Sequence, residues 1–216
     1  MNLTSPASQR RDYCQSVLDR KDLHQDPMQQ FDRWFQEATS CDAIVEPNAM
    51  TLSTASADLH VTSRTVLLKG YDGSGFRFFT NTTSLKGKQI AENSNVALLF
   101  YWTALERQIQ ITGSATLLPH EATEEYFHSR PRESQLGAWA SYQSAPLTHR
   151  EELEDRVKEL QQRFADRVIP VPDFWNGYLV NPDSIEFWQG RSSRLHDRFR
   201  YTKNAEAGWK LERLNP

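Results

Sequence analysis

The sequence predicts a mainly β protein, in which an antiparallel barrel carries helices at its periphery. At least six short segments alternate apolar and polar residues with the period of a strand, and turn-forming residues separate them. Few helical segments lie between them, which argues against a doubly wound parallel sheet. The 216 residues, 38% of them hydrophobic, are enough for one large domain or two small ones.

Composition excludes several classes of function. The net charge of −3 provides no basic field for nucleic acid. The longest apolar runs, such as residues 96–101, are too short to span a bilayer, and the N-terminus has no signal-peptide stretch. Cys14 and Cys41 form neither a disulfide framework nor a zinc motif. We therefore expect a reduced cytoplasmic protein without a metal and without a membrane or nucleic-acid partner.

Three longer regions are predicted to be helical. Asp26 is a good N-cap before Pro27, and apolar residues then recur at helical spacing through Thr39. Residues 119–141 form the second region, in which Pro131 should end a helix after Arg130. The third begins with the capping box Thr148 to Glu151 and continues as an amphipathic helix to about Asp166.

The remaining segments are predicted to be strands and tight turns. We expect strands at residues 49–55, 61–69, 76–80, 95–103, 107–118, 175–180 and 207–213, with a turn at 71–75. Residues 81–90 read as a polar loop that opens a short helix. Its hydroxyls, its backbone N–H groups and Lys86 could cradle a phosphate, although an ordinary capped helix has the same pattern.

The segment Ile185 to Arg198 is predicted to be a strand, a turn at Gly190 to Ser193, and a second strand. Alternation in the second strand would place Arg194, His196 and Arg198 on one face. Two guanidinium groups and an imidazole there suit an anion or an electron-rich ligand. The alternative is a solvated face with Asp197 and Glu186 as ion-pair partners.

The runs IEFWQ and RLHDR, separated by four residues, closely resemble the signature of the pyridoxamine 5′-phosphate oxidases, flavin enzymes that make pyridoxal 5′-phosphate. The resemblance extends over about residues 10–216. It implies an FMN-binding split β-barrel, in a homodimer with two flavins at the interface. We expect a flexible N-terminal arm over residues 1–20 and a single domain over residues 21–216, which includes the C-terminal part for dimerisation and substrate binding.

Two segments, RTVLLK and FFTN with SLK, resemble the FMN-binding segments of the family. The resemblance implies that FMN is bound by Arg64, Thr65, Val66, Leu67, Lys69, Phe79, Thr80, Lys86, Gln108, Gln143, Ser144, Trp188 and Arg198. It also implies that Gln143 and Ser144 come from the partner subunit. Family members often have Tyr where Phe79 stands and Arg where Leu85 stands, so weaker FMN binding than usual is expected.

The string YFHSRPRESQLGAWAS is very like the family segment that binds the substrate phosphate. By this resemblance Tyr126, Arg130 and Ser134 grip the phosphate, together with Lys69; an arginine fork and hydroxyl donors suit a phosphate dianion. Arg194 and His196 are the implied catalytic residues, which hold the substrate ring over the flavin. Arg10 and Tyr13, in a short helical stretch, are implied to close over the substrate.

The activity that the resemblance implies is oxidation of pyridoxamine or pyridoxine 5′-phosphate to pyridoxal 5′-phosphate, in the synthesis and salvage of vitamin B6. A hydride would pass from substrate C4′ to flavin N5, and dioxygen would reoxidise FMN to give hydrogen peroxide. Two alternatives stay open. One is an FMN reductase that uses a nicotinamide, and the other is a non-catalytic protein that stores FMN or pyridoxal phosphate.

Overall fold

The structure is a computed structural model, and it describes residues 12–204 and 208–216. The α-helices are α1 (Pro27–Thr39), α2 (Leu85–Glu92), α3 (His120–Ser129), α4 (Arg132–Ala140) and α5 (Arg150–Phe164). The strands are β1 (Ala49–Ala55), β2 (Val61–Leu67), β3 (Gly70–Asp72), β4 (Gly75–Asn81), β5 (Asn95–Trp102), β6 (Arg107–Leu117), β7 (Trp175–Gln189), β8 (Asp197–Lys203) and β9 (Trp209–Leu214). Short 3-10 helices are η2 (Arg20–Asp22), η3 (Thr103–Leu105) and η4 (Ser192–Arg194).

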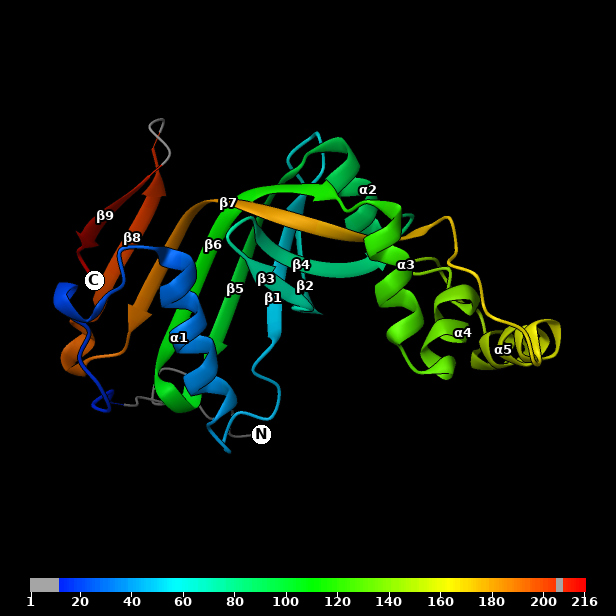
Figure 1. The fold of residues 1–216 in the computed structure, drawn as a ribbon, viewed down its shortest axis with the longest axis horizontal. Helices are drawn as coiled ribbons and strands as arrows, with labels where there is room; N and C mark the ends of the chain where they lie inside the picture. The colour runs from blue at the N-terminus through cyan, green and yellow to red at the C-terminus, as the bar shows by residue number, and fades with distance from the viewer. Residues whose placement is uncertain (1–11, 205–207) are drawn as a thin grey trace, which may run out of the picture. The chain divides into compact units, whose positions relative to one another are not determined.

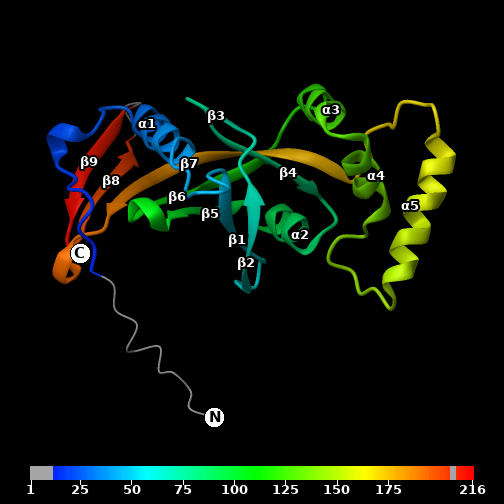
Figure 2. The ribbon, with the colours of Figure 1, turned by 90° about the horizontal axis from the view of Figure 1, so that it is seen from below.

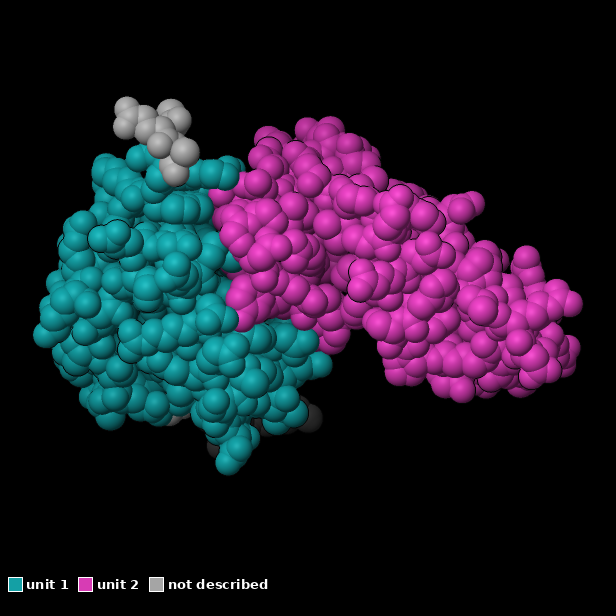
Figure 3. Space-filling model, viewed as in Figure 1, with its two compact units in different colours: residues 1–50, 98–112, 183–216 teal, residues 51–97, 113–182 magenta. Residues whose placement is uncertain are grey.

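The chain forms two compact units, which Figure 3 shows in teal and magenta. Unit 1 contains the described residues within 1–50, 98–112 and 183–216. Unit 2 contains residues 51–97 and 113–182. Among the helices that the structure describes, none has both the length and the apolar character needed to cross a membrane.

The strands in the described residues form one hydrogen-bonded sheet (Figure 1). Its order is β2-β1-β5-β6-β7-β4-β3, and β8 pairs with both β7 and β9. The pairs β3–β4, β4–β7, β7–β8 and β8–β9 are all antiparallel. The prediction of a mainly β, antiparallel protein with peripheral helices is therefore confirmed.

Strand β7 changes its partner along its length. Its first residues, 175–180, pair with β4, and residues 184–189 pair with β8. Pro182 lies between the two ladders, where the missing N–H of a proline interrupts neither of them. One long strand therefore contributes to both units.

Helix α1 forms as predicted and covers part of the core of unit 1. The Asp26 carboxylate accepts a hydrogen bond of 2.9 Å from the Met28 N–H, and Pro27 takes the first helical position. The helix buries Phe31 and Trp34, whose ring centroids lie 5.3 Å from Phe100 and 5.2 Å from Phe187. These edge contacts hold α1 against β5 and β7, beside which it lies in Figure 1.

Helices α3, α4 and α5 of unit 2 share a small core of their own. Pro131 separates α3 from α4 as predicted, and α4 packs beside α5 (Figure 2). Buried residues from these three helices meet the start of β7, and the cluster consists of Phe127, Leu136, Phe164, Ile169 and Trp175. This cluster fixes the helices to the end of β7 that also contributes to the pocket described below.

Two local predictions are wrong. Helix α5 begins at Arg150 and has His149 as a cap residue without a side-chain cap bond, so the predicted capping box at Thr148 and Glu151 does not form. The box fails because the helix starts later than its spacing requires. The predicted turn at residues 71–75 begins instead as strand β3, which at three residues is too short to show a period.

Two helical glycines of unit 2 should respond in opposite directions to the same substitution. A Cβ on Gly87 would lie 2.2 Å from the Thr82 carbonyl oxygen, whereas a Cβ on Gly137 would meet nothing within 4 Å. We expect Gly87→Ala to lower the free energy of unfolding by ~1–3 kcal/mol through overpacking. Gly137→Ala should raise it by up to ~1 kcal/mol, because alanine favours the helix. Urea unfolding of both variants tests this, and equal effects would contradict the close approach of Thr82.

Candidate functional site

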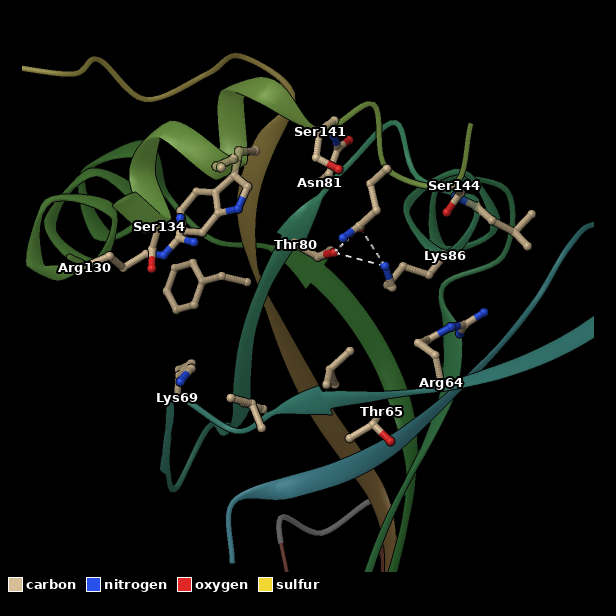
Figure 4. A pocket seen from close by; sticks show the side chains of 18 of the residues that line it. Arg64, Thr65, Lys69, Thr80, Asn81, Lys86, Arg130, Ser134, Ser141 and Ser144 are labelled. Carbon is tan, nitrogen blue, oxygen red and sulfur yellow. Dashed lines mark hydrogen bonds between the residues drawn. The ribbon is translucent and has the colours of Figure 1, made fainter. Parts of the chain in front are cut away.

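A pocket of about 1000 Å³ lies in unit 2 between β2, β4, α2, α3 and α4. Its charged lining residues are Arg64, Lys69, Lys86 and Arg130, and no described lining residue is acidic. Figure 4 shows Arg64 and Lys86 on one side of the pocket and Arg130 with Ser134 on the other. A pocket with cations at two ends and no carboxylate favours a ligand, or a pair of ligands, with two anionic groups.

Arg64 and Lys86 form the first cationic end. From β2, Arg64 Nη1 donates to the Leu52 carbonyl (3.0 Å) and to Thr54 Oγ1 (2.6 Å). From the first turn of α2, Lys86 Nζ donates to Gln143 Oε1 at 2.8 Å and to Thr80 Oγ1 at 3.2 Å (Figure 4). These described partners of both cations are neutral oxygens, so hydroxyl and amide groups hold the two charges in place without neutralising them.

Burial makes this end unusually receptive to an anion. Lys86 is only 8% exposed, and burial, followed by the charge of Arg64, lowers the pKa of Lys86 to about 8. Burial also lowers the pKa of Arg64. Lys86 stands in the first turn of α2, where Ser84 caps the helix by accepting from the Gly87 N–H. A phosphate here would meet two cations and the positive end of a helix.

Gln143 and Ser144 lie at this same end. Besides the contact of Gln143 with Lys86, Ser144 Oγ accepts from the Leu85 N–H at 3.2 Å. Both residues line the pocket of their own chain, and a contribution of this pair from the partner subunit stays a prediction. Leu85, where the family often has arginine, is half-exposed and lines the pocket without adding a charge.

Arg130 dominates the second cationic end. Its guanidinium lies 4.8 Å from the ring centroid of Trp175 and 5.7 Å from that of Phe127. Burial lowers the pKa of Arg130, and its Nη1 atom is buried without a hydrogen-bond partner in the part of the chain that the structure describes. A buried guanidinium N–H of this kind is costly unless it meets an acceptor, so this end also fits an anion.

Tyr126 and Ser134 line the pocket beside Arg130. Tyr126, Arg130 and Ser134 follow one another at intervals of four, but the break at Pro131 places Tyr126 on α3 and Ser134 on α4. The Tyr126 ring stacks on Phe79 with centroids 4.0 Å apart, and Phe79 in turn lies 5.5 Å from Trp175. This aromatic stack forms an apolar wall of the pocket near the second cationic end.

The pocket collects all the site residues that the sequence predicted within unit 2. These are Arg64, Thr65, Val66, Leu67, Lys69, Phe79, Thr80, Lys86, Tyr126, Arg130, Ser134, Gln143 and Ser144. Prediction from the sequence missed other lining residues, among them Thr62, Asn81, Ser141 and Trp175. The aromatic pair Phe174-Trp175 at the start of a strand was a visible signal for the last of these, but a strand tryptophan is more often a core residue.

A second group of predicted residues lies in unit 1. The Trp188 and His196 ring centroids are 4.5 Å apart, and Tyr13 contacts both rings at 5.9 and 5.8 Å. Gln108 is half-buried on β6. The prediction that Tyr13 lies in a helical stretch is wrong, since the first described helical turn begins at Arg20. Arg10 lies outside the described residues.

The predicted alternation of Arg194, His196 and Arg198 on one strand face is wrong. Arg194 belongs to η4 and has a left-handed φ of 62°, as Ser193 does with 55°, and β8 begins only at Asp197. Two successive left-handed residues end the extended backbone that alternation needs. Arg198 does lie on β8, where it donates to both oxygens of Glu186 at 2.8 and 3.2 Å, the ion pair of the alternative interpretation.

The family models match most of the chain. The model described as pyridoxamine 5′-phosphate oxidase matches residues 38–164, and the one described as the pyridoxine 5′-phosphate oxidase C-terminal dimerisation region matches residues 175–216. The pyridoxine/pyridoxamine 5′-phosphate oxidase of Rubrobacter xylanophilus is 50% identical over 97% of this chain and 96% of its own length. That of Rippkaea orientalis is 49% identical over 97% and 99%.

Two solved structures share the fold. PhzG from Burkholderia lata, in complex with tetrahydrophenazine-1-carboxylic acid, has a TM-score of 0.86 at 32% identity and covers 93% of this chain and 98% of its own. A pyridoxamine 5′-phosphate oxidase-related, FMN-binding protein from Nostoc punctiforme has a TM-score of 0.71 at 18% identity and covers 90% and 100%. The predicted split-barrel fold is confirmed by these likenesses. The chain belongs to the pyridoxine/pyridoxamine 5′-phosphate oxidase family and is an oxidoreductase of that type.

Proposed function

We propose that this protein binds FMN and oxidises pyridoxamine or pyridoxine 5′-phosphate to pyridoxal 5′-phosphate, with dioxygen as acceptor and hydrogen peroxide as second product. The supporting observation is the pocket of unit 2, whose described lining has cationic side chains at both ends and no carboxylate. Two phosphate esters, one on the cofactor and one on the substrate, match this arrangement. An oxidase of the vitamin B6 family must bind both phosphate esters at the same time.

The end with Arg64 and Lys86 is our site for the FMN phosphate. Lys86 is positioned by Thr80, by Gln143 and by its place at the α2 N-terminus. The described contacts of Arg64 with backbone and hydroxyl oxygens fix the orientation of its guanidinium group. Thr65, Val66, Leu67 and Phe79 follow along the pocket wall and suit the rest of the cofactor. When bound, FMN supplies the two-electron chemistry that amino-acid side chains lack.

The end with Arg130 is our site for the substrate phosphate. The orphaned Nη1 of Arg130, with the hydroxyls of Tyr126 and Ser134 and the ammonium of Lys69, can surround a dianion with donors. Stacking on Trp175 keeps the guanidinium plane fixed before the ligand arrives, which lowers the entropy lost on binding. The residues at this end therefore anchor and orient the substrate.

The residues of unit 1 complete the proposal. We assign Gln108, Trp188 and Arg198 to the flavin, and Arg194 and His196 to the substrate ring as catalytic residues, with Arg10 and Tyr13 closing over it. The dimerisation region that matches residues 175–216 supports a homodimer. One domain over residues 21–216, an N-terminal arm over residues 1–20 and a cytoplasmic location stay predictions.

Purified protein assayed in air with each phosphate ester tests this function. We expect flavin absorbance, pyridoxal phosphate formation and one peroxide per product. Pyridoxamine without its phosphate should be a far poorer substrate, because Arg130 would be left without its acceptor. Bleaching of the flavin by NADH, without pyridoxal phosphate formation, would instead indicate a reductase. Flavin binding without peroxide would indicate a storage protein, and preference for a tetrahydrophenazine acid would indicate chemistry like that of PhzG.

FMN binding should weaken as the pH rises through about 8. The pKa of Lys86 in the free protein is lowered to about 8, so above that pH the lysine is neutral and must take up a proton to meet the phosphate dianion. Affinity should then fall by up to about tenfold per pH unit. Lys86→Gln should bind FMN about tenfold to a hundredfold more weakly near pH 7 and show no such decline.

Flavin-fluorescence titrations of the apo-protein measure both effects. Lys88→Gln is the matched control, because Lys88 is an exposed lysine of the same helix and does not line the pocket. It should keep the affinity and the pH dependence of the wild type. An affinity that stays constant from about pH 7.5 to 9.5 in the wild type would remove Lys86 from the phosphate site.

Arg194→Ala should raise KM and lower kcat while FMN stays bound, because Arg194 is assigned to the substrate and not to the cofactor. Steady-state kinetics with pyridoxamine 5′-phosphate, and the flavin content of the variant, give the two readouts. Arg150→Ala is the control, since Arg150 is an exposed arginine of α5 that pairs with Glu154. If both variants have wild-type kinetics, Arg194 is not part of the site.

A further inference from the structure

Arg191 makes two hydrogen bonds to the segment that carries His196. The backbone N–H of Arg191 donates to His196 Nδ1 at 3.1 Å. The Arg191 guanidinium Nη1 donates to Asp197 Oδ2 at 3.0 Å. Arg191 therefore holds the residue after His196 with its side chain and His196 itself with its backbone.

The direction of the first of these bonds decides where the imidazole proton lies. A backbone amide can only donate, so Nδ1 of His196 must present a lone pair to it. In a neutral imidazole the proton is then on Nε2. Either the opposite tautomer or the doubly protonated ring would place an N–H of His196 against the N–H of Arg191.

The surroundings of His196 also favour the neutral ring. Its ring lies against Trp188 and Tyr13, and burial lowers its pKa, with the charges of Arg194 and Arg198 acting in the same direction. Asp197 acts in the opposite direction, but its carboxylate already accepts from other groups. These are Arg191 Nη1, Arg213 Nη2 at 2.9 Å and the Leu18 N–H at 3.2 Å.

We propose that Arg191 fixes His196 as the neutral Nε2–H tautomer, so that His196 binds the substrate as a hydrogen-bond donor through Nε2 and accepts no proton during the oxidation. The proposal rests on the proposed function for the identity of the substrate. Its recognition partner is an acceptor atom of a pyridine phosphate, either an oxygen or the ring nitrogen. Arg191 is then a positioning residue, which acts through His196.

The tautomer can be measured without any turnover. Two-bond ¹H–¹⁵N correlation spectra of the uniformly labelled protein report which imidazole nitrogen carries the proton, and the signals that disappear in His196→Gln identify this ring. We expect a lone pair on Nδ1 and a proton on Nε2, retained below pH 6.5, the ordinary pKa of histidine being about 6.5. An Nδ1–H tautomer, or titration at the ordinary pKa, would overturn the proposal whether or not the protein oxidises a pyridoxine phosphate.

Two amides that mimic different nitrogens of the ring give a kinetic test. The amide of His196→Gln can place an N–H near the position of Nε2, whereas that of His196→Asn reaches only the position of Nδ1. A donor role predicts that the Gln variant keeps kcat within about fivefold, with an unchanged pH profile, and that the Asn variant loses at least about tenfold more in kcat/KM.

The opposite pattern would show that His196 transfers a proton. Both variants would then lose activity equally, and the limb of the pH profile that belongs to His196 would vanish in each. Ser192→Ala serves as the control, because Ser192 is an exposed residue of the same turn whose side chain is not assigned to the site. Absence of any oxidase activity in the wild type would contradict the proposed function and leave the spectroscopic result to decide the tautomer.

Discussion

The pocket depends on a pair of cations that are held close together, with neutral oxygens as their described partners. Burial removes hydration from Arg64 and Lys86, and the positive charge of Arg64 makes the protonated state of Lys86 less favourable. For these two reasons the pKa of Lys86 is lowered to about 8. The surrounding hydroxyl, carbonyl and amide oxygens make this arrangement tolerable without cancelling it. A carboxylate in the same place would have stabilised the free protein and blocked an anionic ligand.

Much of the fold follows from local signals in the sequence. Asp26 before Pro27 defines the start of α1, Pro131 divides α3 from α4, and the period-two segments predict β1, β5 and β6 within about one residue of their ends. The failures are also local. The false capping box at Thr148 and the missed β3 both involve a few residues whose conformation depends on tertiary packing and not on a repeating pattern.

Less of the candidate site than of the fold could be predicted from the sequence. Pattern alone indicated a phosphate cradle at Lys86 but could not separate it from an ordinary capped helix. Only the family resemblance joined it to Gln143, which lies 57 residues further along the chain. Trp175 was missed because its contact with Arg130 is set by how α3 meets β7. At Arg194 and His196 the strand pattern failed, because two left-handed residues replace the extended backbone. Deviations of this kind often occur at functional sites.

Strand β7 imposes a constraint on how chains of this design can change in length. A single uninterrupted strand carries Trp175 at the pocket of unit 2 and Trp188 beside His196 in unit 1. Because neighbouring residues of a strand face opposite sides, one amino acid inserted or deleted near Pro182 would invert every side chain on one side of the change. Surface loops accept such events easily, but here a β-bulge would have to absorb the extra residue. Gain and loss of single codons should therefore be far less tolerated in this strand than in the loops of the same protein.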